Sequence, residues 1–321
     1  MRDLYKFIKI GGKEIEFILL LILRSPFDAI HTIILANFLR YSFEAIDHKN
    51  IQNLLIICFI FCIGNCLLFL YNGTIWIKFS SYVTRFVSIV RKKLFKHIST
   101  LTLKTIDEKS SGEWFSRLNS DVGQGLAIIN QPLNLPHAVC AIVNFSISFI
   151  LLFLINQGIL ILVILFLILH LTFSQQFVLK PITELSKKSK EATIKNTTDL
   201  NALITCADTA MVYDAQFFLL EYFEKSSIKL RNANMKIIIR NAISNSILPF
   251  LGLGGYLLIL VISSHWIVTD SMTFGELTAA LQYRGSVIAS AIMFTNCLVS
   301  IRTAMVGVRR ILETFNTKRE E

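Results

Sequence analysis

Long apolar stretches alternate with polar and charged stretches along this chain of 321 residues. Each apolar stretch holds about 20 residues, which matches the roughly 30 Å hydrocarbon thickness of a bilayer when the stretch is helical. The pattern predicts six membrane-spanning helices, at about residues 16–38, 51–72, 137–156, 159–179, 242–265 and 274–300. Residues 1–15 mix basic and apolar positions and predict a cytoplasmic lead-in along the membrane surface, and residues 317–321 form a short tail.

The connections between the predicted spans are unequal in length. Residues 41–51, 156–158 and 266–272 make short links, whereas 75–133 and 180–241 are long. Apolar positions continue at helical spacing beyond the second span, and neither Pro nor Gly occurs between 75 and 110. A helix from 51 to about 105 would be about 80 Å long, so we expect it to project far out of the bilayer.

Composition and charge support a multi-pass membrane protein. The chain is 53% hydrophobic and 17% charged, with a net charge of +10. Lys and Arg gather near the N-terminus, in 78–117, in 180–240 and at the C-terminus, so the positive-inside rule predicts cytoplasmic termini. We expect the plasma membrane as the location, with the basic residues facing anionic lipid or protein. Their spread along membrane-flanking helices argues against a nucleic-acid partner.

Three of the six cysteines share one helix face, because Cys58, Cys62 and Cys66 recur every four residues. Three thiols on one face suit a soft metal, but small apolar side chains on a packed helix are the favoured interpretation. We therefore expect no metal site.

The polar stretch after the long second helix carries the most specific motif. Residues 110–113, Ser-Ser-Gly-Glu, have the form of a capping box, as do residues 273–276, Thr-Phe-Gly-Glu. By local chemistry alone the first is equally well a solvated loop. However, SGEWFSRLNSDV at 111–122 resembles the first intracellular loop of ABC exporter transmembrane domains, which reads S/T-G-E-L-L-S-R-L-x-x-D-V.

The resemblance extends over nearly the whole chain. FGELTAALQY at 274–283 resembles the family pattern V-G-x-L-x-A-F-x-x-Y, and VGVRRILE at 306–313 resembles A-S-x-x-R-I-x-E. The second loop departs from the family pattern, because Met211, Tyr213 and Gln216 replace its Lys, Phe and Glu. The resemblance implies an all-α fold over 16–316, with six long transmembrane helices that extend into the cytoplasm and two short coupling helices.

In that family, two such domains pair, and their coupling helices contact ATP-binding domains. The resemblance therefore implies a second transmembrane domain, in a homodimer or heterodimer. By register, the residues that contact the ATPase are Ser111, Gly112, Glu113, Trp114 and Arg117 in the first loop and Leu200, Asn201, Leu203, Ile204 and Thr205 in the second. For Trp114, internal packing under the helices and anchoring in a partner groove both stay open.

The sequence contains no G-x-x-x-x-G-K-[ST] phosphate loop and no evident set of catalytic residues. We therefore expect no cofactor in this chain, and ATP and Mg²⁺ on a separately encoded ABC ATPase subunit. The chain itself would be the membrane half of an ATP-driven exporter.

Charged groups inside the predicted spans are candidates for a substrate cavity, because an unpaired charge in hydrocarbon is costly. They are Arg24, Asp28, His31 and Arg284. Arg24 and Asp28 lie four residues apart and can pair on one helix face, although Pro26 between them predicts a kink. Structural ion pairing is the equally weighted alternative. Cavity-facing roles would suit a peptide or amphiphile with polar or acidic groups.

Two other functions remain open. One is a non-transporting regulatory or assembly protein on the same scaffold. The other is a secondary transporter in which Asp28 and His31 carry protons.

Overall fold

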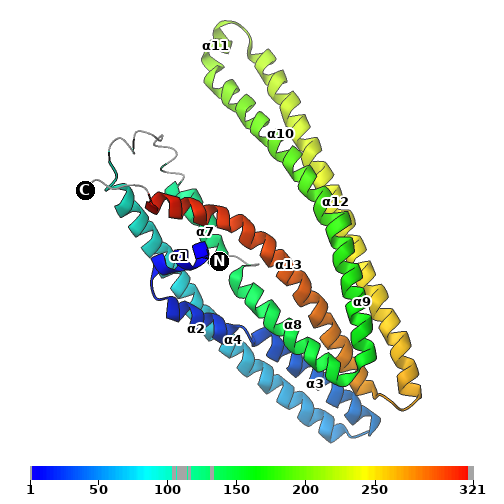
Figure 1. The fold of residues 1–321 in the computed structure, drawn as a ribbon. Coiled ribbons are helices and arrows are strands. Elements are labelled where there is room, and N and C mark those ends of the chain that lie inside the picture. The colour runs from blue at the N-terminus through cyan, green and yellow to red at the C-terminus, as the bar shows by residue number, and fades with distance from the viewer. Residues whose placement is uncertain (1, 103–105, 107–113, 115–116, 131–133, 317–321) are drawn as a thin grey trace. The chain divides into compact units, whose positions relative to one another are not determined.

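The computed structural model describes residues 2–102, 106, 114, 117–130 and 134–316. Within these residues, six helices are long and apolar enough to cross a membrane, which confirms the expected all-α fold with six spans (Figure 1). By its internal contacts the chain divides into two compact units, 1–160 with 263–321 and 161–262.

The first unit contains most of the spans. Its helices are α1 (Arg2–Gly11), α2 (Glu14–Arg24), α3 (Phe27–Asp47), α4 (Ile51–Ile98), α7 (Val122–Asn130), α8 (Leu135–Ile155) and α13 (Phe274–Asn316), with the π-helical turn η1 (Arg117–Asp121). It also includes the first residues of α9 (Gln157–Phe173) and the last of α12 (Gln216–Val268). The start of α1 and the end of α13 lie at the same end of this unit, where Arg309 Nε is 3.7 Å from Asp3 Oδ2.

One predicted connection is helical. Residues 41–47 belong to α3, which ends at Asp47, so only His48–Asn50 link it to α4. The reason lies in the polar residues themselves. Arg40 Nε donates to Glu44 Oε1 at 3.1 Å, an i,i+4 pair that supports continued helix.

Helix α4 changes character along its 48 residues. Up to Leu67 its large apolar side chains are mostly exposed, as at Phe59, which is 69% exposed. From Phe79 onward the apolar residues form a one-sided buried stripe, in which Phe86 is 1% exposed. Apolar residues all round suit lipid, whereas a one-sided stripe is typical of a helix between a protein core and water. The second half of α4 therefore extends beyond the hydrocarbon, as the sequence predicted.

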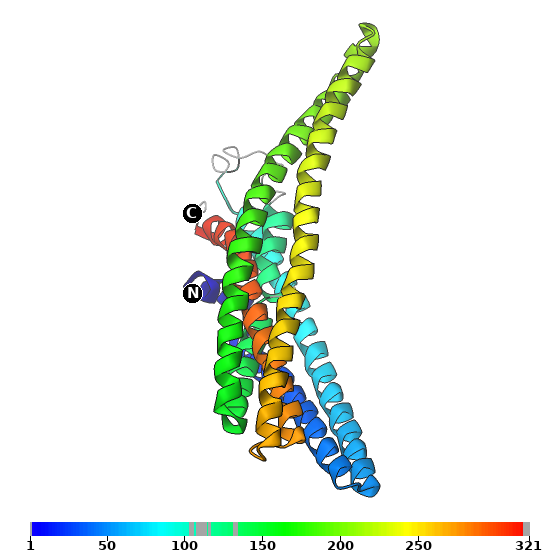
Figure 2. The ribbon, with the colours of Figure 1, turned by 90° about the vertical axis from the view of Figure 1, so that its right-hand side faces the viewer.

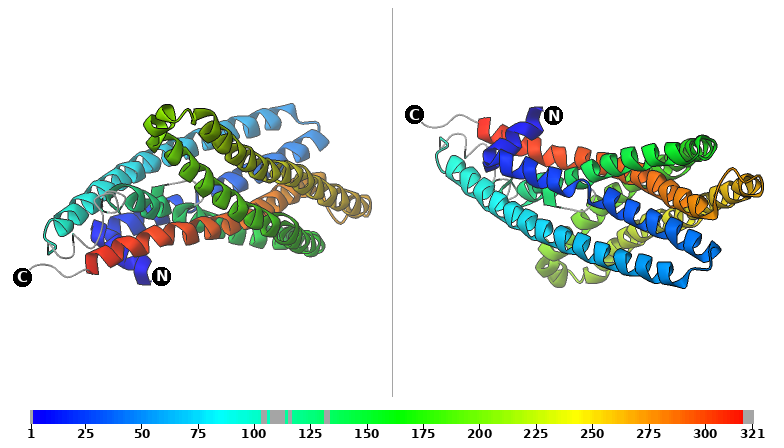
Figure 3. Two further views of the ribbon diagram at one scale, coloured as in Figure 1. Left: turned by 90° about the horizontal axis from the view of Figure 1, so that it is seen from above. Right: turned by 90° about the horizontal axis from the view of Figure 1, so that it is seen from below.

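The hydrophobic core of the first unit lies around this second half of α4. It contains side chains from α1, α2, α4, α7 and α13: Phe7, Phe17, Leu20, Phe79, Tyr82, Val83, Phe86, Val90, Leu94, Val122, Leu126, Ile128, Ile129, Ala304, Val308 and Ile311. Helix α1 packs against α4 and α13 (Figure 3). Its ring Phe7 meets Phe86 edge to face at 5.4 Å between centroids, and a Cβ at Gly11 would collide with the same Phe86 ring.

Helices α7 and α8 run antiparallel to α13 in one continuous register. Asp121 pairs with Arg310, and Gly125 lies against Gly307. Further along, Ser300 Oγ lies 3.4 Å from Asn134 Oδ1, and Asn144 contacts Ser290. As residue numbers rise along α7 and α8, the residue numbers of their partners on α13 fall by nearly the same amount. A Cβ at Gly307 would lie 2.7 Å from Gly125 N and 2.9 Å from Asp121 O, so this crossing leaves no room for a side chain.

The second unit is a long helical hairpin (Figure 2). It contains the rest of α9, the π-helical turn η2 (Ser174–Leu179), α10 (Lys180–Thr205), α11 (Ala207–Val212) and α12 up to residue 262. Polar side chains join its two arms. Ser189 Oγ donates to Asn234 Oδ1 at 2.6 Å, and Asn196 Nδ2 donates to the hydroxyls of Ser226 and Ser227. The short helix α11 forms the tip.

We predict that a membrane-impermeant charged maleimide labels one native cysteine, Cys206. Cys62 and Cys66 are also exposed, but on the lipid-facing half of α4, where a charged reagent does not penetrate. Cys206 follows the charged helix α10 and faces water. Mass spectrometry after labelling of inside-out vesicles measures this, with Cys206→Ser as the control. Labelling at Cys62 would contradict the assigned lipid boundary.

We also predict that Gly307→Ala destabilises the protein by about 1–3 kcal/mol, because the added methyl overpacks the α7–α13 crossing. Gly64→Ala is the matched control. Gly64 lies inside α4 with nothing within 4 Å of the added Cβ, so Ala is neutral or gains up to about 1 kcal/mol in helix stability. Thermal unfolding of both variants in detergent gives the comparison. Equal midpoints for the two would show that the crossing is not tight.

Candidate functional site

A polar cavity of about 360 Å³ lies in the first unit, between the α2–α3 junction, α4, α8 and α13. Three of the four residues predicted for a substrate cavity lie in its wall, namely Arg24, Asp28 and His31. The remaining wall residues are Phe27, Thr32, Asn72, His137, Cys140, Ala141, Asn144, Ala289, Ser290 and Met293. The fourth predicted residue, Arg284, is buried on α13 outside this wall.

Arg24 is held from two sides. Its Cζ lies 4.1 Å from the centroid of the Trp76 ring on α4, a cation–π distance, and its Nη2 lies 3.3 Å from His137 Nε2 on α8. A guanidinium group only donates hydrogen bonds, so His137 Nε2 accepts this one. The charge is therefore fixed between two helices on one side of the cavity.

The ion pair that the spacing of Arg24 and Asp28 allowed does not form in the described residues, where both residues line the cavity. Helix α2 ends at Arg24 and α3 begins at Phe27, because Pro26 cannot continue the hydrogen bonding of α2. The spacing of four residues therefore crosses a break and does not place both side chains on one continuous helix face. Both charges face the same cavity without bonding to each other.

Asn144, which was not among the predicted site residues, lines the cavity and joins three helices. Its Nδ2 donates to Ser286 Oγ and Ser290 Oγ on α13, both at 2.9 Å, and Thr32 Oγ1 on α3 lies 3.4 Å from its Oδ1. Interhelical hydrogen bonds of this kind hold membrane helices together where no water competes. In the sequence, the feature that could have indicated this role is an amide side chain inside a mainly apolar span.

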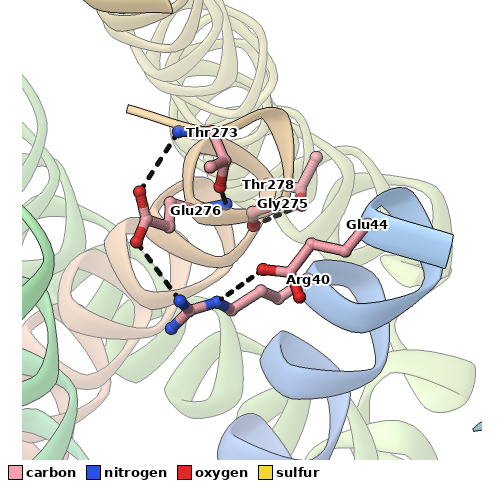
Figure 4. Close-up of polar contacts among 6 residues, drawn as sticks. All are labelled: Arg40, Glu44, Thr273, Gly275, Glu276 and Thr278. Atoms are coloured by element: carbon pink, nitrogen blue, oxygen red, sulfur yellow. Dashed lines mark hydrogen bonds and ion pairs between the residues drawn. The ribbon is translucent and has the colours of Figure 1, made fainter. Parts of the chain in front are cut away.

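A second polar cluster fastens the start of α13 to the end of α3 (Figure 4). Thr273 and Glu276 form the predicted capping box, in which each side chain accepts from the other residue's backbone N–H at 3.1 Å. The other oxygen of Glu276 accepts from Arg40 Nη2 at 3.2 Å. A Cβ at Gly275 would lie 2.5 Å from the Arg40 carbonyl oxygen, so glycine permits this close approach.

At the other end of α13, the first-loop motif meets the motif at 306–313. Arg310 Nη1 lies 3.2 Å from Asp121 Oδ1, and Arg117 Nη1 donates to Thr314 Oγ1 at 2.7 Å. Both loop residues belong to the π-helical turn η1, and both contact α13. Asp121 and Arg310 were not predicted as site residues, although both lie in the quoted motifs.

Trp114 is 7% exposed. Its Nε1 donates to the Ile106 carbonyl at 3.1 Å, and the Arg117 guanidinium lies 5.6 Å from its ring centroid. Of the two interpretations left open, this position agrees with internal packing of the ring. The other first-loop candidates, Ser111, Gly112 and Glu113, lie outside the described residues.

The second-loop candidates lie in the last turns of α10, next to the hairpin tip. Leu200, Asn201, Ile204 and Thr205 are exposed, and Leu203 lines an apolar hollow of about 210 Å³ beside α11. Large apolar side chains at the tip are also exposed: Met211, Val212, Tyr213, Phe217 and Phe218. Phe217, which is 80% exposed, was not predicted as a contact. No group of three or more His, Cys, Asp or Glu suited to a metal occurs among the described residues.

The family model described as the ABC transporter transmembrane region matches residues 15–291. The chain belongs to this family. The match covers the first-loop motif and every cavity residue except Met293, and it ends within α13 before Arg310. The resemblance predicted from the motifs is confirmed, and the protein is a multi-pass membrane protein of the ABC exporter type.

Curated relatives are proteins named ATP-dependent lipid A-core flippase. The one from Wigglesworthia glossinidia brevipalpis is 22% identical over 266 residues, covering 78% of this chain and 43% of the relative. Those from Yersinia pestis bv. Antiqua (strain Antiqua) and Pasteurella multocida (strain Pm70) are each 22% identical, covering 75% of this chain and 42% of the relative. The chain spans less than half the length of these relatives.

We predict that Asn144→Ala lowers the free energy of unfolding by about 1–2 kcal/mol, because it removes the hydrogen bonds that join α3, α8 and α13 inside the membrane region. Ser146→Ala is the control on the same helix, since the exposed Ser146 hydroxyl bonds only its own helix at the Ile142 carbonyl. Thermal unfolding in detergent compares them. A loss for Ser146→Ala as large as that for Asn144→Ala would refute the assigned role.

Proposed function

We propose that this chain is the membrane-spanning subunit of an ATP-driven exporter, that it forms the substrate pathway, and that it couples to a separate ABC ATPase subunit. The proposal includes pairing with a second transmembrane domain. The family match supports the exporter type of membrane region. The ATPase partner, the pairing with a second transmembrane domain and the class of substrate are inferred from individual residues of the chain.

The observation that carries the proposal is the double attachment of α13. One end of this helix is bonded to the first-loop motif through Arg310–Asp121 and Arg117–Thr314. Further along, the same helix supplies Ser290 and Met293 to the cavity wall. A rigid helix that contacts both places transmits a displacement from the loop to the cavity. Such a link is what an exporter needs to convert ATP hydrolysis outside the membrane into a change at its substrate site.

An ATPase partner is supported by the hairpin tip and by the sequence. No phosphate-loop motif occurs in these residues. The tip of the second unit follows a helix with many Lys residues, so it lies in water, yet it exposes Met211, Tyr213 and Phe217. Exposed apolar side chains of this size are typical of a protein interface. We assign this tip, with the first loop, to contacts with the ATPase.

Orientation follows from charge. Lys and Arg gather in the extensions and near both termini, while 156–158 and 266–272 carry neither residue. We propose that both termini, the second half of α4 and the α11 tip are cytoplasmic, in the plasma membrane. The ion-paired cluster of Arg40, Glu44 and Glu276 then lies at the outer side of the membrane.

The substrate class that fits best is an amphiphile. The cavity wall combines polar and charged groups with the rings of Phe27 and His31. The relatives at 22% identity are named as flippases of lipid A-core, which is itself an amphiphile. The proposed substrate is therefore an amphiphile, either a lipid or an amphiphilic peptide, and both are to be tested.

We predict that Asp121→Asn lowers ATP-driven transport at least about tenfold without unfolding the protein, because it removes the charge that pairs with Arg310. The experiment reconstitutes this chain in liposomes with the ABC ATPase encoded nearest to it. ATPase rate and flux of fluorescent lipid and labelled peptide are then measured. Uncoupling should appear as retained ATP hydrolysis with reduced flux.

Glu313→Gln is the matched control, since it removes a carboxylate on the same exit segment that forms no ion pair in the described residues. Equal flux in Asp121→Asn and the wild type would contradict the proposal that α13 transmits a displacement from the first loop to the cavity. Binding of the ATPase, or a raised ATPase rate, without any flux of lipid or peptide would favour the regulatory alternative. Flux driven by a proton gradient without nucleotide would favour the secondary transporter, because Asp28 and His31 both line the cavity.

A further inference from the structure

The cavity wall contains two nitrogen donors without a hydrogen-bond partner among the described residues, Arg24 Nη1 and His137 Nδ1. His137 Nε2 accepts from Arg24, so in the neutral ring the hydrogen is on Nδ1 and this atom donates. Both nitrogens are buried, and a buried donor without a partner is costly. The charged Arg24 donor suits an oxygen of an anionic group such as a phosphate, whereas the His137 donor leaves its ring on the side away from Arg24.

Asp28 supplies the opposite charge to the same cavity. Its carboxylate forms no ion pair in the part of the chain that the structure describes, because the break at Pro26 separates it from Arg24. Thr32, one turn further on, bonds the backbone carbonyl of Asp28 and leaves the carboxylate available. A cationic group in the cavity would therefore find its partner here.

Aromatic rings share the cavity wall with Asp28. Phe27 and His31 line the cavity and stack at 6.4 Å between centroids, and Phe69 meets both rings edge on at 5.9 Å. Ammonium groups are attracted to the faces of aromatic rings as well as to carboxylates. The region around Asp28 thus suits an organic ammonium better than a small, strongly hydrated metal ion.

Arg24 and Asp28 are the only Lys, Arg, Asp or Glu residues in the described wall, so their formal charges cancel. A ligand with net negative charge would be attracted by Arg24 but repelled by Asp28. A cation would be attracted by Asp28 but repelled by Arg24. The ligand that satisfies both carries one negative and one positive group. A volume of about 360 Å³ is at the lower end of the range for small-molecule sites, about 300–1,000 Å³, so it suits a headgroup without acyl chains.

We propose that this cavity binds the zwitterionic headgroup of an amphiphile, with its phosphate at Arg24 and its ammonium at Asp28. The proposal rests on the proposed function, because it names the class of amphiphile that the exporter subunit recognises. The acyl chains remain outside the cavity, in the lipid.

The test titrates the full-length protein in detergent with three lipids that share dioleoyl chains, and native mass spectrometry gives each affinity. Phosphatidylethanolamine carries phosphate and ammonium, phosphatidylglycerol carries phosphate alone, and dioleoyl trimethylammonium propane carries ammonium alone. We expect phosphatidylethanolamine to bind at least tenfold more tightly than either of the others. Because the chains are identical, the difference reports the headgroup.

Variants assign the two halves of the site. Asp28→Asn should bring the affinity for phosphatidylethanolamine down to that for phosphatidylglycerol, and Arg24→Gln should bring it down to that for the cationic lipid. His137→Gln removes the ring that holds the Arg24 guanidinium in place, so it should weaken both phosphate lipids and spare the cationic one. It provides a second test if Arg24→Gln does not fold. Glu16→Gln and Arg85→Gln are the matched controls, since they remove the same kinds of charge outside the cavity.

Equal binding of phosphatidylethanolamine and phosphatidylglycerol by the wild type would overturn the proposal. An unchanged order of affinities in folded Asp28→Asn would do so as well, as would losses in the two controls equal to those in the cavity variants. Binding is measured without nucleotide and without the ATPase. Failure here therefore leaves the exporter proposal standing, whereas absence of ATP-driven flux with selective headgroup binding would count against the exporter and not against the site.

Discussion

The arrangement of the first unit depends on a close crossing of two glycines. Gly125 and Gly307 let the backbones of α7 and α13 meet with no side chain between them. That contact fixes the antiparallel register of α13, which then determines the other partnerships along it. Asp121 faces Arg310 on one side of the crossing, and Asn144 faces Ser286 and Ser290 on the other. A shift of one residue along α13 would separate all of these pairs at once.

The environment of the chain decides how the same residue types are used. In the first half of α4 the apolar side chains point outward, since lipid solvates them without cost. In the second half, the same kinds of side chain turn inward and form the core with α1, α2, α7 and α13. Burial inside the protein therefore concentrates where water surrounds the helices. Within the spans, specific polar contacts such as those of Asn144 hold the helices in place of a hydrophobic core.

Features set by local sequence were predictable. The capping box at Thr273 and Glu276 forms both expected hydrogen bonds, because its geometry depends on four consecutive residues. The six spans and the long second helix followed from apolar content and from the absence of Pro and Gly. The family followed from motifs, and three of the four charged candidates do share a cavity.

Features set by contacts between distant segments were not predictable in the same way. The role of Asn144 depends on helices more than 100 residues apart in sequence, and nothing local to it indicates its partners. Asp121 and Arg310 were each visible within a motif, but their pairing follows from the register of α13. The ion pair that a spacing of four allowed between Arg24 and Asp28 does not form in the described residues, because the spacing crosses Pro26, where α2 has ended.

The break at Pro26 also separates the chain mechanically. On its N-terminal side, α2 is anchored to α4 by Phe17 against Phe79 and Tyr82. On its other side, α3 is tied to α13 by Arg40 and Thr32. A tilt of α13 would carry α3 with it through these bonds, and Pro26 is the point at which α3 would turn relative to α2. Asp28 would then move with α3, so the angle between α2 and α3 sets where its carboxylate lies in the cavity wall.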